Sequence, residues 1–587
     1  MVKSPQDFIA ATVVAVALAV VFTWPLAPKL ATAGRIDGDG RYSVWNVAWV
    51  ARALTSGAPV SLYDANIFYP YSGTLAFSEP NVLAGALGVP AWLATRNAVA
   101  TTNWVTLCSF VLSFVTMFAL GRRIAGTRAA AALAATLFAF SAYTFSHLPH
   151  VQLLLTFGLP LSLLAMHAFV ERPGLRTATG LGLALFVQAL GCGYYGVFAA
   201  LSVGWGLIWF GVGTGQARRP AFWLWAALAG SIAVAGIWPF FAPMLNVQAD
   251  GFGRTLDDAR IFAADWRSYL ASPFLVYEWM LPLLGQWRGV LFPGLLALVL
   301  TGAAVVRTLG PWRRPAPVTT PLTVGYYLSL GGLALWASFG PDAGLYRVLY
   351  AVVPVFSFLR ATRRFGVLVT LATAVLAGVG LADLQRHARV TRRSVIVLVV
   401  LSCSLIRSTV GPLDLTEWDR SPVVYKRLAQ MPVGPVAEFP FFNSPADCHR
   451  QTEYMLASTL HWQPLINGCS DFIPDQAFQD MSVLGQFPDA AAWAVLRRRG
   501  ARYIVMHWNM YPPGQSPHVF VRSRLVGRYL RTIVDHDDAA LFEVVRWPQG
   551  TDARIASADG RSGGVRGYFN RYTTVVSVSA GSGVGSP

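Results

Sequence analysis

Long stretches without charged residues recur through the first 410 residues, and they constrain the fold more than any other feature. A helix needs about 20 apolar residues to cross the roughly 30 Å of hydrocarbon in a bilayer. Only 13% of the 587 residues are charged, 54% are hydrophobic and the mean hydropathy is +0.47, which is too apolar for a water-soluble globule. The sequence therefore predicts a mainly α-helical, polytopic membrane protein. About eleven spans are expected, at Phe8–Leu26, Asn103–Gly121, Ala129–Ser146, Val151–Val170, Ala178–Cys192, Tyr194–Gly213, Ala221–Leu245, Gly289–Val306, Pro321–Gly340, Gly366–Leu384 and Ser394–Val410.

Two shorter apolar runs, Val82–Ala94 and Leu345–Leu359, leave the span count open, and the positive-inside rule decides between the alternatives. If neither run crosses the membrane, five arginine clusters between spans fall on the side of Lys3. We therefore expect both runs to be interfacial helices on the outer surface. The N-terminus is then cytoplasmic in a multi-pass protein of the bacterial inner (cytoplasmic) membrane. The clusters are Arg122/Arg123/Arg128, Arg172/Arg176, Arg218/Arg219, Arg307/Arg313/Arg314 and Arg386/Arg389/Arg392/Arg393.

The net charge of +17 raises the question of a nucleic-acid partner. However, the arginines occur in short clusters between apolar stretches, where they act as topology signals. We therefore expect membrane lipids, and no nucleic acid, as partners.

Three large segments are predicted to lie outside the cytoplasm. They are a first external loop over residues 31–102, a second over residues 246–288, and the chain from about Gly411 onward. The second loop has no cationic excess, which agrees with an external position. Residues 411–548 contain strand-like runs broken by Pro, Asn, Asp and Gly, which predict a soluble extracytoplasmic α/β domain after the transmembrane domain of residues 1–410. These runs are Val433–Phe441, Tyr503–His507 and Ala540–Val545, and residues 549–587 predict a weakly ordered Gly/Ser/Arg-rich tail.

Carboxylates just beyond the first span are the strongest candidates for chemistry. Asp37 and Asp39 lie in the segment Arg35–Trp49, near the start of the first external loop. Transfer of a sugar to a hydroxyl group needs a carboxylate that accepts the acceptor's proton as the new bond forms. Asp39 is the first candidate for this base and Asp37 the second. From the residues alone, an ordinary Asp-Gly turn is the alternative.

Aromatic and amide side chains are dense in the same loop and could bind a sugar. Aromatic faces pack on sugar rings, and Asn donates to hydroxyl groups. Glu79 could be a second carboxylate or a metal ligand, although a charge favoured by the dipole of the interfacial helix explains it best. An interfacial aromatic belt would equally explain Tyr194 and Tyr195. The candidate substrate contacts are Trp45, Asn46, Trp49, Tyr69, Glu79, Tyr194 and Tyr195.

Three arginines lie at the outer end of a predicted span, against the positive-inside trend. They are Arg360, Arg363 and Arg364. Guanidinium groups match phosphate oxygens bidentately, so this cluster is the candidate site for the phosphate of a lipid donor. Nonspecific binding of anionic head groups is the alternative.

A weaker candidate site is formed by His147, His150 and Gln152, at the outer mouth between two spans. Two histidines three residues apart could bind a divalent cation on a helix face. Pro149 interrupts that helix, however, and paired histidines are commonly only hydrogen-bonded. A divalent cation is therefore a candidate cofactor, and the residues leave a metal site undecided.

Cys448 and Cys469 differ from the other cysteines because both fall in the predicted exported domain, where the compartment is oxidising. A bridge between them would close a loop of about 20 residues and contribute roughly 3 kcal/mol. The alternative is two unpaired thiols. A zinc site is disfavoured because no CxxC or HxxxH spacing accompanies them.

Six segments distributed over most of the chain share a pattern with known proteins. They are Gly38–Gly40 with Trp45 and Trp49, Asn66–Pro70, Thr74–Glu79, His150–Gln152, Leu359–Gly366 and Tyr454–Gly468. On these motifs the chain resembles bacterial membrane proteins of the GT-C glycosyltransferase superfamily, which includes protein mannosyltransferases and the aminoarabinose transferases that modify lipid A. The resemblance implies a polyprenyl-phosphate-linked sugar as donor, a glycan, lipid or protein as acceptor, inversion at the anomeric carbon, and Asp39 as base. One departure is Gly40, where the closer group would have a proline.

Two other classes of function are compatible with a polytopic chain. A transporter or flippase would move a lipid-linked or small substrate, and it would usually place ionisable groups near the bilayer midplane or show broken inverted repeats. A non-catalytic scaffold would bind glycans or proteins through its exported domain, and its first-loop acids could change without consequence. Because the spans are nearly free of charge and the polar residues collect on one outer face, the sequence favours a membrane glycosyltransferase.

Overall fold

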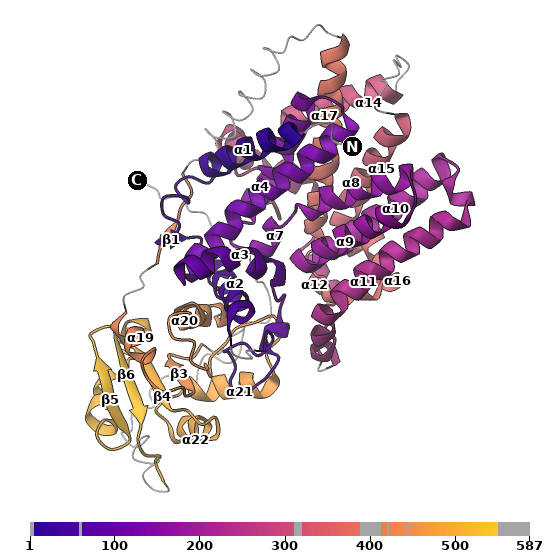
Figure 1. The fold of residues 1–587 in the computed structure, drawn as a ribbon. Coiled ribbons are helices and arrows are strands. Elements are labelled where there is room, and N and C mark those ends of the chain that lie inside the picture. Colours follow the sequence, from indigo (N-terminus) through magenta and orange to yellow (C-terminus); the bar gives the residue numbers. More distant parts are fainter. Residues whose placement is uncertain are drawn as a thin grey trace.

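The computed structural model describes residues 5–57, 61–249, 251–309, 320–387, 412–418, 422–442, 447–512 and 514–549. A bundle of long helices forms the larger part, and a small α/β domain lies at one end of it (Figure 1). The predicted span Ser394–Val410 and the tail beyond residue 549 lie outside the described residues.

Seven helical segments of the described chain are long and apolar enough to cross a membrane. They are Pro5–Phe22 (α1), Ala98–Ile124 (α4), Arg128–Ser146 (α5 and α6), Val151–Glu171 (α7 and α8), Gly193–Gly213 (α10), Pro220–Ala249 (α11) and Thr362–Arg386, which holds most of α17 (Gly366–His387). Shorter helices in the bundle are Val82–Thr95 (α3), Leu175–Gly191 (α9), Leu295–Leu309 (α14) and Pro321–Ser338 (α15). The mainly helical class with several apolar helices is confirmed, and the number of eleven spans stays a prediction.

The ends of these helices follow ordinary capping chemistry. Helix α4 begins after Asn97, whose side chain accepts hydrogen bonds from Val99 N at 2.9 Å and Ala100 N at 3.2 Å. Helix α17 is apolar all round and almost fully buried, as expected for the centre of a bundle. Helix α11 has 30 residues and is therefore about 45 Å long. It leaves Leu224 and Trp238 exposed, as a helix at the lipid-facing edge would.

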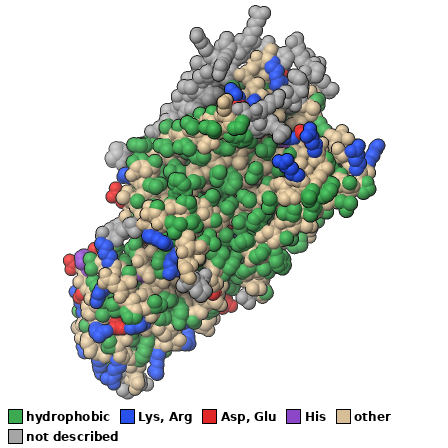
Figure 2. Space-filling model, viewed as in Figure 1, with side chains coloured by type: hydrophobic (Ala, Val, Ile, Leu, Met, Phe, Trp, Pro, Cys, Tyr) green, Lys and Arg blue, Asp and Glu red, His purple; other side chains and the backbone are tan. Residues whose placement is uncertain are grey.

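Ion pairs tie the arginine-rich ends of several helices together. Asp7 of α1 is buried and pairs with Arg122 of α4 at 3.3 Å and with Arg128 of α5 at 2.5 Å. Arg307 of α14 pairs with Asp383 of α17 at 3.1 Å. Charged side chains gather towards the two ends of the molecule, and hydrophobic side chains cover the broad band between them (Figure 2). The described arginine clusters thus share one end of the bundle with the start of α1.

The segments predicted as external loops gather at the opposite end, between the bundle and the C-terminal domain (Figure 1). In the first loop, helix α2 (Asp39–Thr55) packs on α3, α4 and the C-terminal helix α20, and a short 3₁₀ helix (Thr74–Phe77) follows. The second loop forms α12 (Leu256–Ile261), two 3₁₀ turns and α13 (Leu281–Leu284). Of the two runs expected to be interfacial, the first forms α3, and the second forms α16 (Leu345–Val352) and a 3₁₀ turn at Pro354–Phe358. A further 3₁₀ turn, Thr362–Phe365, follows the second run.

A four-stranded sheet organises the C-terminal domain, in the order β3-β4-β6-β5. Strand β3 (Val436–Phe439) runs parallel to β4 (Tyr503–His507), while β6 (Ala539–Val544) is antiparallel to both β4 and β5 (Leu530–Asp535). Its helices are α19 (Val423–Leu428), α20 (Thr452–Ser458), α21 (Asp475–Leu484), α22 (Ala490–Arg498) and α23 (His518–Phe520). The three strand-like runs of the sequence correspond to β3, β4 and β6, and the edge strand β5 was not predicted. The domain boundaries at residues 411 and 548 stay predictions.

Backbone hydrogen bonds join the first loop to this domain. Phe68 N donates to the Asn467 carbonyl at 3.0 Å, and Tyr69 N donates to the Leu465 carbonyl at 2.8 Å. Leu465 N donates back to the Asn66 carbonyl at 2.9 Å. A two-residue strand, β1 (Ala33–Gly34), also pairs with β2 (Thr416–Glu417), just before the C-terminal domain. Backbone hydrogen bonds therefore connect the first external loop to the part of the chain that follows the bundle.

Candidate active site

Asp39 is the first residue of helix α2. Helix α2 lies where the bundle meets the C-terminal domain (Figure 1). The preceding Gly38 has a φ of 46° and a ψ of −117°, which glycine adopts far more readily than other residues. Gly40 is required because an added Cβ atom would lie 1.9 Å from the Arg35 carbonyl oxygen. Its N–H donates to the Asp37 carbonyl at 2.8 Å, which a proline could not do. The Asp-Gly turn thus places Asp39 in the first turn of a helix, where the dipole favours a carboxylate.

His150 is the partner of this carboxylate. Its Nε2 atom lies 3.0 Å from Asp39 Oδ2. The hydrogen bond with His150 is the main reason that the pKa of Asp39 is lowered from its ordinary value, and the nearby charges of His449 and Arg360 add to the effect. The Asp39 side chain is also 69% exposed. Asp39 is therefore an ionised carboxylate that can receive a proton from an incoming group.

Asp37, the second candidate base, is turned towards Arg35. Its Oδ2 atom lies 3.0 Å from an Arg35 guanidinium nitrogen, and Arg35 also donates to the Asp414 carbonyl at 3.0 Å. Asp37 thus belongs to the connection between the first loop and the entry to the C-terminal domain, and it is Asp39 that contacts His150.

Three side chains from segments far apart in the sequence meet at the Asp471 carboxylate. Arg360 and Arg254 reach the same oxygen of Asp471, Oδ1, at 3.2 Å and 2.7 Å. Ser78 Oγ donates to the other oxygen, Oδ2, at 2.7 Å. Since the charge of Arg360 also lowers the pKa of Asp39, this cluster and the candidate base share one neighbourhood.

The other two arginines predicted to bind phosphate have different surroundings. Arg363 donates to the Arg288 carbonyl at 2.8 Å and lies over the Phe262 ring at 5.5 Å. Arg364 lies over the Tyr194 ring at 4.2 Å. Arg360 lies over the same Phe262 ring as Arg363, at 5.0 Å, whereas Arg364 packs on a different ring. Of the three arginines, it is Arg360 that pairs with Asp471. A phosphate-binding role for Arg363 and Arg364 stays a prediction.

The aromatic and amide residues at the start of the first loop are packed into its interior. Trp45, Asn46 and Trp49 are all buried. The Trp45 indole N–H donates to Asn66 Oδ1 at 3.0 Å, and that of Trp49 donates to the Leu62 carbonyl at 2.9 Å. The Asn46 amide donates to a backbone carbonyl of the same loop at 3.1 Å. These contacts favour a structural role, and substrate contact by these residues stays a prediction.

Glu79 does not head the interfacial helix as expected, because α3 begins at Val82, after Asn81. Its Oε1 atom instead accepts a hydrogen bond from the backbone N–H of Gly193, the first residue of α10. Burial raises the pKa of Glu79, while the bond from Gly193 and the charge of Arg364 oppose the increase. Glu79 thus accepts a hydrogen bond at the N-terminus of a different helix from the one predicted.

The three candidate tyrosines fall in different places. The Tyr194 hydroxyl accepts from the backbone N–H of Arg360 at 2.8 Å and from that of the next residue at 3.2 Å, so it positions the arginine segment. Tyr195 is buried and its hydroxyl lies 2.9 Å from that of Tyr143. Tyr69 is 37% exposed at the junction with the C-terminal domain. A role in binding substrate stays a prediction for each.

The predicted histidine pair does not form a complete metal site. The His147 and His150 rings are 6.3 Å apart, and His147 Nδ1 lies 2.7 Å from the Tyr143 carbonyl oxygen. Burial lowers the pKa of His147 to about 3, so this ring is neutral. Gln152 Oε1 is buried without a hydrogen-bond partner in the described part of the chain. Within those same ranges no group of three or more His, Cys, Asp or Glu side chains is arranged to hold a metal, and the divalent cation stays a prediction.

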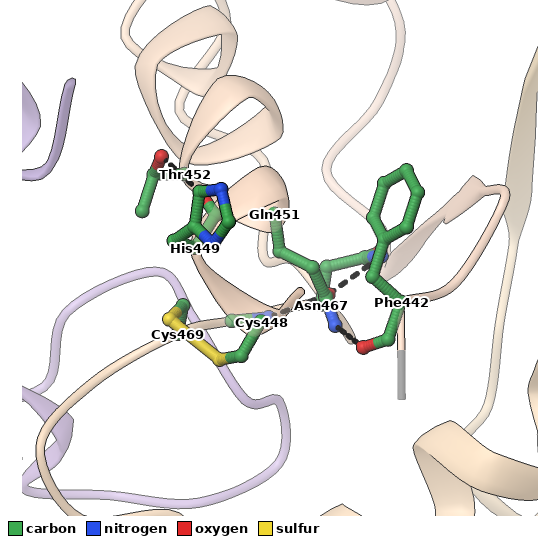
Figure 3. Close-up of a disulfide and its surroundings, with 8 residues drawn as sticks. Phe442, Cys448, His449, Gln451, Thr452, Asn467 and Cys469 are labelled. Carbon is green, nitrogen blue, oxygen red and sulfur yellow. Dashed lines mark hydrogen bonds between the residues drawn. A yellow bond between two sulfur atoms is a disulfide. The ribbon is translucent and has the colours of Figure 1, made fainter. Parts of the chain in front are cut away.

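Cys448 and Cys469 form a disulfide, with Cα atoms 5.7 Å apart. The bridge lies beside the early part of the chain, which is drawn in pale purple in Figure 3, and the charges of Asp39 and Asp471 lie near the Cys469 sulfur. Gln451 of the same turn donates to the Phe442 carbonyl at 2.9 Å. The disulfide therefore anchors the segment that carries Asp471.

Arg254, Ser78 and Asp471 were missed as site residues in the sequence. Arg254 is one arginine in a loop whose charges balance, and nothing in its spacing marks it. Ser78 lies next to Glu79, in a motif that was noticed for other residues. Asp471 follows Cys469 by two residues, so the cysteine was the available signal.

Comparison with known proteins gives matches at the level of structure. No protein-family model and no curated protein matches the chain. The apo oligosaccharyltransferase of Archaeoglobus fulgidus aligns with a TM-score of 0.43 and 14% identity, over 86% of this chain and 70% of that one. Its complex with Zn and sulfate gives 0.45 and 15%, over 85% and 68%. ArnT from Cupriavidus metallidurans in the apo state gives 0.39 and 12%, over 90% and 97%.

These neighbours are GT-C membrane glycosyltransferases. They belong to the superfamily that the motifs of this chain resemble.

Proposed function

We propose that the protein is a membrane glycosyltransferase. It transfers a sugar from a polyprenyl-phosphate-linked donor to a glycan, lipid or protein acceptor at the external face of the bacterial inner membrane. The observation that carries the proposal is the presence of an ionised, exposed carboxylate, Asp39, in the same neighbourhood as the guanidinium of Arg360. A base and a cation next to each other are what sugar transfer from a phosphate requires.

In the proposed reaction, Asp39 accepts the proton of the acceptor hydroxyl as its oxygen attacks the anomeric carbon. The bond between that carbon and the phosphate oxygen breaks, and polyprenyl phosphate leaves with the electron pair. Attack opposite the leaving group inverts the configuration. Arg360 stabilises the charge that develops on the departing phosphate. His150 orients the Asp39 carboxylate and keeps it ionised.

The test is the Asp39→Asn variant, which keeps the shape of the side chain and removes the base. Transfer is measured with a panel of radiolabelled undecaprenyl-phosphate monosaccharides, by release of undecaprenyl phosphate and by label in the acceptor fraction. We expect a rate loss of about 10²- to 10⁴-fold, which is the usual contribution of a general base. The thermal unfolding midpoint should be unchanged.

Asp342→Asn is the matched control, since Asp342 is an exposed carboxylate that pairs with Arg260 at 2.9 Å in another part of the structure. It should transfer at the wild-type rate. Full transfer activity in the Asp39→Asn variant would show that Asp39 is not the catalytic base. Failure of the wild type to transfer any sugar in the panel would favour the scaffold or transporter alternatives.

A further inference from the structure

Asp471 is held more extensively than an ordinary surface carboxylate. Two guanidinium groups converge on its Oδ1 atom, Arg254 at 2.7 Å and Arg360 at 3.2 Å. A hydroxyl group, that of Ser78, donates to its other oxygen at 2.7 Å. The Asp471 side chain nevertheless remains 36% exposed. This arrangement is a three-donor cradle for one anionic group that solvent can reach.

The cradle itself is fixed by contacts that do not involve Asp471. Arg254 N donates to the Ser357 carbonyl at 2.8 Å, and the Tyr350 hydroxyl donates to the Arg254 carbonyl at 2.8 Å. The Arg254 guanidinium carbon lies 4.7 Å from the centre of the Phe252 ring, and only 15% of its side chain is exposed. The Arg360 guanidinium carbon likewise lies 5.0 Å from the centre of the Phe262 ring. Each guanidinium group therefore has a contact that would remain if another anion replaced the carboxylate.

The occupant and the cradle come from different parts of the protein. Arg254, Arg360 and Ser78 belong to segments between the helices of the bundle, whereas Asp471 belongs to the C-terminal domain. Its loop is attached at one side by the disulfide of Cys469 and at the other by Phe472, whose N–H donates to the Phe77 carbonyl at 2.9 Å. The loop thus holds the Asp471 carboxylate between Arg254, Arg360 and Ser78.

We propose that Arg254, Arg360 and Ser78 form the binding site for a phosphate ester, and that the Asp471 carboxylate occupies this site until the phosphate displaces it. A phosphomonoester, such as the polyprenyl phosphate released in the proposed reaction, has more anionic oxygens than a carboxylate, and arginine binds both in the same bidentate geometry. The proposal rests on the proposed function for the identity of the ligand as a lipid-borne phosphate. It adds Arg254 and Ser78 as ligands and makes the C-terminal domain a competitor for the donor.

The test is calorimetric titration of the full-length protein in detergent with farnesyl phosphate. Removing the competing charge in Asp471→Asn should tighten binding about tenfold, the equivalent of one charge-assisted hydrogen bond. Arg254→Gln should weaken binding about tenfold for the same reason. Arg260→Gln is the matched control, because Arg260 is an arginine of the same external loop as Arg254 but pairs with Asp257 and Asp342 instead, and it should bind like the wild type.

Asp471→Glu separates competition from a merely structural role. The longer side chain retains the charge, so its affinity should stay close to that of the wild type, whereas a docking contact that depends on shape would respond to Glu and Asn alike. Repeating the titrations with inorganic phosphate identifies the source of the anion. Tightening for farnesyl phosphate alone supports a lipid-borne ligand, and tightening for both supports a site for any phosphate. An Asp471→Asn affinity that is unchanged or weaker for both probes would overturn the proposal.

Binding and sugar transfer are measured separately, so the two proposals can fail independently. A wild-type protein that shows the expected binding pattern but transfers no sugar contradicts the proposed function alone. A protein that transfers sugar but whose affinity ignores Asp471 and Arg254 contradicts this inference alone.

Discussion

Replacing Gly40 with alanine should slow sugar transfer without unfolding the protein. The added Cβ atom would lie 1.9 Å from the Arg35 carbonyl oxygen, whereas real contacts of this kind essentially never fall below 3.0 Å. The obstacle is backbone, so the turn that carries Asp39 has to move by about 1 Å. A catalytic group misplaced by about 1 Å can cost about 10²-fold in rate, or about 2.7 kcal/mol in the barrier.

The assay compares Gly40→Ala with the wild type in the undecaprenyl-phosphate sugar panel, together with the thermal unfolding midpoint of each. Gly204→Ala in α10 is the matched control, since an added Cβ atom there has no neighbour within 4 Å. We expect the control to transfer at the wild-type rate and Gly40→Ala to lose about two orders of magnitude.

Two results would refute this reasoning. Wild-type transfer by Gly40→Ala would show that the Arg35–Gly40 turn does not set the position of Asp39. An equal loss of transfer in Gly204→Ala would show that the effect does not arise from the turn.

Three further predictions concern pH and stability. The His150→Ala variant loses the hydrogen bond that chiefly lowers the pKa of Asp39, so this pKa should rise. The acidic limb of the pH–rate profile should then move to higher pH, and an unchanged limb would contradict the pairing of Asp39 with His150. Replacing Cys448 and Cys469 with serine removes a cross-link between positions 21 residues apart and should lower the free energy of unfolding by about 3 kcal/mol, as measured by denaturant titration alongside the wild type under non-reducing conditions. Asp480→Ala strips the partner from two arginines, one of them buried, and should cost about 3 to 5 kcal/mol in the same titration, while a loss below about 1 kcal/mol would contradict the buried pair.

The sequence predicted the helical bundle and most of the C-terminal strands because both depend on local patterns. Uncharged stretches of helical length mark α4 and α17, and alternating apolar residues mark β3 and β4. The edge strand β5 escaped because its central residues are partly exposed and polar, as edge strands often are. An edge strand such as β5 lacks the alternation of apolar and polar residues that identifies a strand in the sequence.

The candidate base was accessible to sequence reasoning, whereas its surroundings were not. Asp39 follows a predicted span and stands between two glycines, and this position indicates a site at the membrane surface. The groups that lower its pKa lie far along the chain: His150 is 111 residues away and Arg360 is 321 residues away. The density of aromatic residues in the first loop makes Trp45 and Trp49 candidate sugar contacts. Their burial and the acceptor of each indole N–H depend on tertiary packing, which the sequence pattern does not show.

The hydrogen bonds between residues 66–69 and 465–467 have a consequence for how the protein can be divided. The segment 465–467 also bonds to strand β3, since Ile466 N donates to the Val436 carbonyl at 2.8 Å. The first loop therefore pairs with a segment that extends the edge of the C-terminal sheet. A fragment that begins after the bundle would expose this edge as unpaired backbone, which promotes self-association. Separating the bundle from the C-terminal domain would break the backbone hydrogen bonds that join them and leave unpaired N–H and carbonyl groups on both parts.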